Sequence, residues 1–199
     1  KRQRAPMRYA PGHKAETRDR ILSAAEIAFG IHGYDGVGVD GLAAQAGITS
    51  GAFYGHFRSK AEVFRVAAVA GLQRLRQGIE RFHEHPGRPW VRPFMQHYLA
   101  PPFRQGLEGG CALPSLSSEV ARSDAGTRAC YEAELLRVVD TLAANMPDAD
   151  SPARRRAWAM MALLAGGATL ARTVEDAGVA AEIAAAVTDM VAAVTGEES

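Results

Sequence analysis

The segment that decides the fold is residues 39–60, VDGLAAQAGITSGAFYGHFRSK. Its first part spaces apolar residues as on one face of a helix, at Val39, Leu42, Ala43 and Ala46. Gly47 ends this helix, because a glycine just past a helix end adopts the left-handed conformation at little cost. These residues predict a short helix followed by a tight turn.

A second short helix is predicted after that turn. Either Thr49 or Ser50 can accept hydrogen bonds from the free amides that open it. Phe53 and Phe57 lie four residues apart and are expected to face inward, while Tyr54 points to another face. Two helices joined by a short turn with a glycine form a helix-turn-helix motif, whose second helix enters the major groove of DNA.

The fixed spacings in this segment resemble the DNA-binding module of the TetR family of bacterial repressors. The matching positions are Leu42-Ala43, Ala46-Gly47-Ile48, Gly51, Phe53-Tyr54, His56-Phe57, Ser59-Lys60 and Phe64. An upstream run resembles the family's first helix, at Ile21, Leu22, Ala24-Ala25, Phe29 and Gly33-Tyr34. The chain departs from the family at Gly38, where Thr or Ser is usual, and at Gly41, where a carboxylate is common. Beyond residues 17–64 the resemblance is one of layout only.

The DNA contacts are predicted on the second helix of the motif and just after it. The residues expected to read DNA are Thr49, Ser50, Gly51, Tyr54 and His56. Gly51 allows a close approach of the backbone, and Tyr54 and His56 are expected to reach phosphates. Lys60 heads the next helix and is expected to bind a phosphate together with the free amides there. Ser59 is expected to cap that helix, with Glu62 completing a capping box.

Composition and charge fit a DNA-binding protein of the reducing cytoplasm. The chain has 199 residues, of which 47% are hydrophobic and 23% charged, enough for a real core. Residues 1–60 carry nine Lys and Arg against five Asp and Glu, and the remainder is mildly acidic. Two cysteines are too few for a disulfide scaffold. Neither a signal peptide nor a run of about 18 unbroken apolar residues is evident, so no membrane span is expected.

The fold class expected is all-α, with an N-terminal three-helix domain joined by a long helix to a C-terminal helical domain. We divide the chain into a flexible basic arm (1–13), a helix-turn-helix domain (14–60) and an effector-binding and dimerisation domain (61–199). The arm is either a minor-groove or phosphate contact or a tail without a role. The other helices are expected at residues 14–32, 59–85, 90–103, 115–122, 125–145, 151–177 and 179–194, with Gly178 between the last two.

The last two helices have apolar faces suited to a subunit interface. Their residues on these faces include Leu163, Gly167, Leu170, Ile183, Val187, Met190, Val191 and Val194. The alternative is the ordinary core of a monomeric helical domain. The family resemblance implies a homodimer through a four-helix bundle, and a palindromic DNA operator requires two copies of the motif.

The interior of the C-terminal domain is expected to bind a small-molecule effector, apolar or aromatic. The candidates are Trp90, Met95, Tyr98, Phe103, Cys111, Tyr131, Trp158 and Met161, for each of which core packing is the alternative. Cys111 follows two glycines, and at a helix start its pKa could fall and give a reactive thiolate. The alternative is a buried, inert thiol.

Three classes of function are weighed. The first is a dimeric transcriptional regulator, a repressor released from double-stranded DNA by a small molecule. The second is a helical enzyme, but the sequence has none of the local metal, phosphate-loop or dinucleotide spacings, so no catalytic residue, metal or cofactor is expected. The third is a helical protein-interaction module that uses the motif for protein contact.

Overall fold

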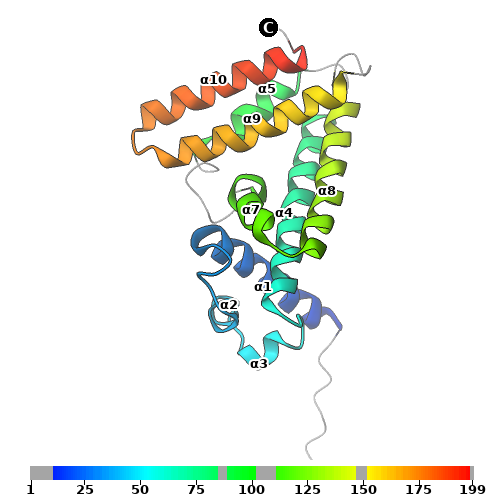
Figure 1. Cartoon of the computed structure of the whole chain (residues 1–199), viewed down its shortest axis with the longest axis vertical. Coiled ribbons are helices and arrows are strands. Elements are labelled where there is room, and N and C mark those ends of the chain that lie inside the picture. Colours follow the sequence, from blue (N-terminus) through cyan, green and yellow to red (C-terminus); the bar gives the residue numbers. More distant parts are fainter. Residues whose placement is uncertain (1–10, 85–88, 102–110, 147–151, 198–199) are drawn as a thin grey trace, which may run out of the picture. The chain divides into compact units, whose positions relative to one another are not determined.

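The computed structural model describes residues 11–84, 89–101, 111–146 and 152–197. Within these ranges the chain forms nine helices and no strand (Figure 1), which confirms the expected all-α class. The helices are α1 (Pro11–His32), α2 (Val39–Gln45), α3 (Ser50–Phe53), α4 (Lys60–Phe82), α5 (Val91–Tyr98), α7 (Ala112–Arg122), α8 (Ala125–Ala144), α9 (Ala153–Thr173) and α10 (Ala177–Thr195). The chain divides into two compact units, Lys1–Ala67 and Ala68–Ser199. The boundary between them lies inside α4.

The first unit is built around an aromatic cluster. Its largest fully buried side chains are Ile21, Phe29, Leu42, Phe53, Phe57 and Phe64. The Tyr34 ring, from the turn after α1, lies 5.9 Å from Phe29 and 5.1 Å from Phe64 between ring centroids. These ring contacts join α1, the turn after it and the first turns of α4, while the Phe53 ring of α3 lies 5.9 Å from that of Phe57.

The starts of α1 and α4, both in the first unit, differ in detail from expectation. α1 begins at Pro11, so residues 11–13 belong to the helix and not to the arm, while residues 1–10 lie outside the described ranges. Proline suits a first helical position because its missing N–H would have no partner there. At α4 the Ser59 hydroxyl accepts the Glu62 N–H at 3.1 Å. The Glu62 carboxylate accepts the N–H of Arg58 at 2.7 Å, one residue earlier than a capping box requires.

Two helices of the second unit have different bounds from those expected. α5 ends at Tyr98 and not at residue 103, because Pro101 disfavours the helical conformation of the residue before it. α7 begins at Ala112, three residues earlier than expected, with Pro114 in its first turn. A proline there removes no helical hydrogen bond, since the first N–H groups of a helix have no partner in the helix.

The break between α9 and α10 also lies at a different position from the one predicted. The expectation that Gly178 separates them is wrong: α9 ends at Thr173, and Gly178 lies in the first turn of α10. The cause is Asp176, whose carboxylate accepts the Val179 N–H at 2.9 Å and so caps α10 ahead of the glycine.

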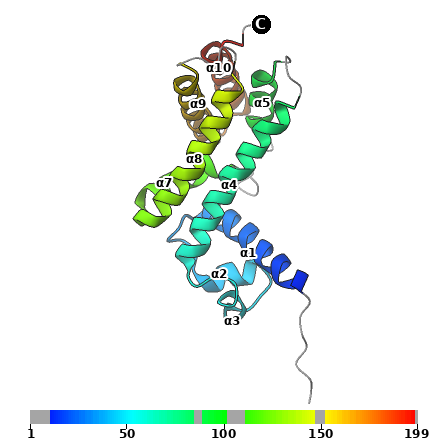
Figure 2. The ribbon, with the colours of Figure 1, turned by 90° about the vertical axis from the view of Figure 1, so that its right-hand side faces the viewer.

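The second unit is a helical bundle in which α9 and α10 form a hairpin (Figure 1). A Cβ atom on Gly167 would lie 2.8 Å from Cγ2 of Val187, so the missing side chain lets the two helices approach closely. α5 lies beside the end of α4 (Figure 2), where the rings of Phe82 and Phe94 meet at 5.6 Å.

A carboxylate fixes the start of α5 from the far end of the chain. Glu197 accepts the backbone N–H groups of Trp90, Val91 and Arg92 at 2.6, 3.0 and 2.8 Å. Arg92 in turn pairs with Asp189 of α10 at 2.7 Å. An anion at these free amides also complements the helix dipole, so the C-terminal residues hold α5 against α10.

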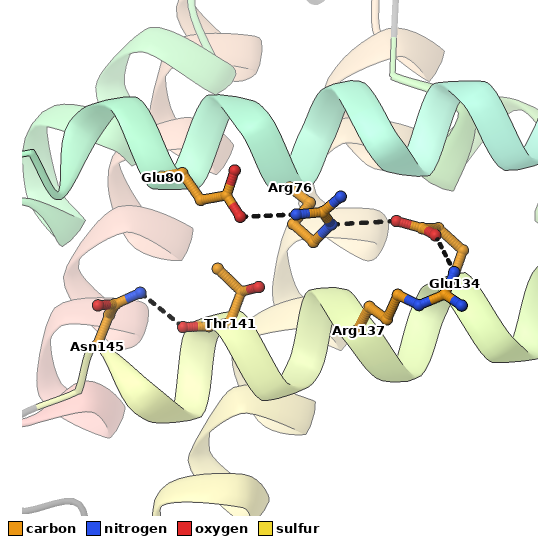
Figure 3. Close-up of polar contacts among 6 residues, drawn as sticks. All are labelled: Arg76, Glu80, Glu134, Arg137, Thr141 and Asn145. Atoms are coloured by element: carbon orange, nitrogen blue, oxygen red, sulfur yellow. Dashed lines mark hydrogen bonds and ion pairs between the residues drawn. The ribbon is translucent and has the colours of Figure 1, made fainter.

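A buried ion network joins α4 to α8 (Figure 3). The Glu134 side chain is 1% exposed and accepts hydrogen bonds from Arg76 at 3.1 Å and Arg137 at 2.7 Å. Arg76 also pairs with Glu80 at 2.7 Å. Desolvation by itself would raise the pKa of Glu134, but the hydrogen bonds from Arg137 and Arg76 outweigh it and hold that pKa below its usual value. Glu134 is therefore charged at neutral pH and satisfied at both oxygens.

Candidate functional site

The turn of the helix-turn-helix has the geometry that its glycine predicts. Gly47 adopts a φ of 68°, and the next N–H, of Ile48, donates back to the Ala43 carbonyl at 2.9 Å. Thr49 then caps α3, with its hydroxyl accepting the Ala52 N–H at 3.2 Å. These bonds set the angle at which α3 leaves α2.

Ser50 and Gly51 of α3 were both predicted to contact DNA, but their surroundings differ from each other. The Ser50 hydroxyl donates a very short hydrogen bond to the Asp40 carboxylate, which ties α3 to α2. A Cβ atom on Gly51 would meet only the Thr49 hydroxyl oxygen, at 3.9 Å. No close packing within the unit therefore explains the glycine, which leaves open space on an exposed face.

Tyr54, His56 and Lys60 follow α3. The Tyr54 side chain is 57% exposed, while Phe53 beside it is fully buried. The His56 carbonyl accepts a hydrogen bond from Arg18 at 3.0 Å. Lys60 donates to the Tyr34 carbonyl at 3.0 Å, and its ammonium lies 4.1 Å from the centre of the Tyr34 ring. Lys60 therefore braces its own unit, a role that sequence analysis missed because Tyr34 is far from it along the chain.

A groove of about 550 Å³ runs beside the motif in the first unit. The described residues that line it are Lys14, Thr17, Arg20, Gly47, Ile48, Thr49, Ala52 and His56, none of them acidic. Lys14 and Arg20, both exposed on α1, bring positive charge to the same surface as Thr49 and His56. Neither residue was predicted to contact DNA, although both lie in the basic N-terminal segment of the sequence. A basic groove beside an exposed recognition helix can bind a polyanion.

The second unit contains a cavity of about 410 Å³. Its described lining residues come from α4, α5 and the start of α7: Gly71, Arg74, Leu75, Gly78, Arg81, Phe82, Phe94, His97, Tyr98 and Cys111. Two of the expected pocket residues, Tyr98 and Cys111, are among them. The others are elsewhere or outside the described ranges.

The remaining expected pocket residues have other surroundings. Trp90 donates its indole N–H to the Asn145 carbonyl at 3.1 Å, and the Tyr131 hydroxyl is hydrogen-bonded to Ser117 at 3.0 Å. Met95 and Met161 are buried core residues, and Trp158 is 39% exposed. Phe103 lies outside the described ranges. The arginines and glycines of α4 that line the cavity were missed, because the expected pocket residues were aromatic residues, methionines and Cys111.

Cys111 is not the activated thiol that its place at a helix start suggested. It is the N-cap of α7, where its sulfur accepts the Leu113 N–H at 3.4 Å. Desolvation by burial is the largest effect and raises the pKa of the Cys111 thiol, against smaller opposing effects of the Tyr98 hydroxyl and the Leu113 N–H. The thiol is therefore protonated at neutral pH.

The expected interface residues fall into two groups. Leu170 and Met190 are 57% and 53% exposed, and Leu163, Ile183, Val187 and Val194 are half-buried. Val191 is fully buried, and Gly167 is buried against Val187 of the same chain. These two residues therefore offer no surface to a second copy. Trp158 and Val179 add exposed apolar surface to the α9–α10 hairpin that was not anticipated.

The turn at Gly47, the capped recognition helix and the basic groove define a helix-turn-helix DNA-binding protein. Residues 21–67 match the family model described as bacterial regulatory proteins, tetR family. The chain is 27% identical over 187 residues to the HTH-type transcriptional regulator LmrA of Bacillus subtilis, covering 88% of this chain and 96% of LmrA. It is 38% identical over 71 residues to the HTH-type transcriptional repressor BepR of Brucella suis, covering 36% and 33% of the two chains.

The fold is shared with solved structures. A transcriptional regulator of the TetR family from Agrobacterium tumefaciens superposes with a TM-score of 0.76 at 20% identity, covering 92% of this chain and 99% of that one. The chain therefore carries the DNA-binding module of the TetR family over residues 21–67 and shares the fold of that solved regulator. Within the described ranges no group of three or more His, Cys, Asp or Glu side chains is placed to hold a metal ion.

Proposed function

We propose that this regulator is a homodimeric repressor that binds a palindromic operator and leaves it when a small molecule binds the second unit. The observation that carries the proposal is the exposed face of the capped recognition helix, with open space at Gly51 and an exposed Tyr54. The name of the Brucella relative, a transcriptional repressor, supports repression over activation.

The operator contacts come from residues 49–60. Thr49, Ser50 and Gly51 face the bases, and Tyr54 and His56 reach phosphates. Lys60 keeps two ammonium protons beyond the one given to Tyr34, and with these it binds a phosphate at the start of α4. Lys14 and Arg20 add phosphate contacts from α1.

The dimer forms through the exposed apolar face of the α9–α10 hairpin, defined by Trp158, Leu170, Val179 and Met190.

By length and composition α10 is the one described helix that is apolar enough to cross a membrane, and 22% of its most apolar stretch is buried within the protein. Glu182 and Asp189 lie within it, and each carboxylate would be costly in a bilayer, by about 2.5–3.5 kcal/mol at its centre. A second copy covers the apolar face and leaves both charges at the rim, so we place the protein in the cytoplasm.

A two-fold dimer must hold its recognition helices about 34–36 Å apart, or a multiple of that, to bind two half-sites. α4 supplies residues to both units, since residues 60–67 belong to the first and residues 68–82 to the second, where Arg74, Gly78 and Phe82 are among those that line the cavity. A ligand that shifts α4 changes the spacing of the recognition helices and weakens operator binding.

The test is a gel shift with DNA from beside the protein's own gene. We expect a complex of one dimer per palindromic site, for which unrelated DNA competes poorly. Binding that is equally tight to unrelated DNA, or no binding at all, would favour the interaction module. The relatives named above are transcriptional regulators, which disfavours the enzyme.

A further inference from the structure

Gly78 is a glycine inside α4 that no packing contact in the described structure requires. A Cβ atom built on it would meet only one Arg81 nitrogen, at 3.9 Å. Glycine in the interior of a helix costs about 1 kcal/mol relative to alanine. By contrast, packing requires the glycine two helical turns earlier, Gly71. A Cβ atom there would lie 2.1 Å from the Cβ of Ala112. Gly78 lines the cavity of about 410 Å³, so its missing side chain preserves empty space there.

One part of the cavity wall is apolar and aromatic. Leu75 and Phe82 come from α4 and Phe94 from α5, and the two phenylalanine rings contact each other edge to face. Such walls and such a volume are typical of a site for a small organic molecule. A flat ring fits best beside a glycine and between aromatic edges, because stacked and edge contacts need close approach.

The polar groups that line the cavity favour a negatively charged ligand. Arg74, Arg81 and His97 line it, and none of its described lining residues is acidic. The Tyr98 hydroxyl is also there: Tyr98 is 7% exposed, and its buried oxygen has no nitrogen or oxygen partner among the described residues. The neighbouring Cys111 thiol interacts with it, but a thiol is a weak hydrogen-bonding group. Burial raises the pKa of Tyr98 well above its ordinary value, so the hydroxyl keeps its proton and is available as a donor.

We propose that this cavity binds small aromatic carboxylates, with the ring against Gly78 and Phe94 and the carboxylate at the Tyr98 hydroxyl and the arginines of α4. A carboxylate accepts both a neutral O–H donor and an arginine, and such charge-assisted bonds are about twice as strong as neutral ones. This inference rests on the proposed function in that it names the chemical class of the effector.

The test compares 2-naphthoate with its uncharged analogue 2-naphthamide by calorimetry on the intact protein. We expect 2-naphthoate to bind about tenfold more tightly, equal to about 1.4 kcal/mol. Arg74→Gln with Arg81→Gln should remove that preference. Equal binding of the two compounds, or no binding of 2-naphthoate at millimolar concentration, would overturn the inference.

A pair of substitutions at Gly78 tests the place of binding. Gly78→Leu fills the cavity and should abolish binding of 2-naphthoate, while Gly78→Ala should bind it and unfold at a higher temperature than the parent. If Gly78→Leu binds 2-naphthoate as the parent does, the site is wrong. If Gly78→Leu does not fold, the arginine double variant still decides the matter.

Operator binding in the same samples separates this inference from the proposed function. A protein that shifts its operator but does not bind 2-naphthoate loses only the ligand class. A protein that binds 2-naphthoate with the expected variant pattern, equally well with and without DNA, keeps the site and loses the release mechanism. Coupling of the two sites would appear as a ligand affinity about 5–150-fold lower in the DNA complex.

Discussion

Lys60 at the head of α4 lies over the ring of Tyr34, 4.1 Å from its centre, and donates to the carbonyl of the same residue at 3.0 Å. One side chain thus both closes the turn after α1 and places a positive charge where α4 begins. The two roles can be separated, because only a phosphate contact changes the response of DNA binding to salt.

Lys60→Met keeps the aliphatic stem and removes the charge. We expect the slope of log K against log salt to fall by about 0.9 in magnitude per subunit, with weaker operator binding. Fluorescence anisotropy over a range of salt concentrations measures this slope. Weaker binding with an unchanged slope would mean that Lys60 acts only through Tyr34.

Tyr54 is the most exposed aromatic side chain of the described chain, at 57%. Tyr54→Ala should therefore leave the unfolding temperature within a degree or two of the parent, and should weaken operator binding about tenfold by removing a hydrogen bond to a phosphate. Ile31→Ala is the matched control, since Ile31 is an exposed apolar residue of α1, 43% exposed, outside the motif. Gel shifts that show equal affinity for Tyr54→Ala and the parent would remove Tyr54 from the interface.

The exposed members of the α9–α10 face test the dimer. Leu170→Glu with Met190→Glu should give a folded monomer with weak operator binding, because the two carboxylates would be buried at the contact. Ala133→Glu, on the exposed side of α8, should remain dimeric. Sedimentation velocity measures both. A parent that is monomeric at micromolar concentration, or a double variant that is still dimeric, contradicts the proposal.

The raised pKa of Cys111 predicts a slow thiol. Because the thiolate is the reactive form, labelling of Cys111 by iodoacetamide at pH 7 should be slower than labelling of the exposed Cys130, and should keep rising with pH past about 8.5. Peptide mass spectrometry follows the two sites separately. After treatment with an electrophile, the Cys111→Ser variant should bind the operator as the treated parent does. Preferential labelling of Cys111 at pH 7 would restore it as a sensor.

Glu134 should control stability in acid. Its folded-state pKa is lowered, so its contribution is fully present above the unfolded pKa of about 4.3 and is lost as pH falls through the folded value. Glu134→Gln should lower the free energy of unfolding at pH 7 by about 1–3 kcal/mol and flatten its fall in acid. Glu132→Gln, exposed on the same helix, is the control. Denaturant unfolding that is identical for both variants would contradict this role.

Much of the DNA-binding unit was predictable from sequence because its signals are local. The turn at Gly47, the cap at Thr49 and the inward spacing of Phe53 and Phe57 each involve residues within one or two helical turns. The second unit was less predictable at its helix ends, where a strong cap such as Asp176 overrode the glycine two residues later.

By itself the sequence determined the helical class and the helix-turn-helix, since helical periodicity, a turn glycine and an N-cap act between near neighbours in the chain. Only the tertiary structure decided which groups meet across long separations. It placed Glu197 on the amides of α5, Glu134 between two arginines, and Gly78 and Tyr98 in the lining of one cavity. Those contacts depend on how whole helices pack, and helix packing is set by the sum of many side-chain contacts that no short segment contains.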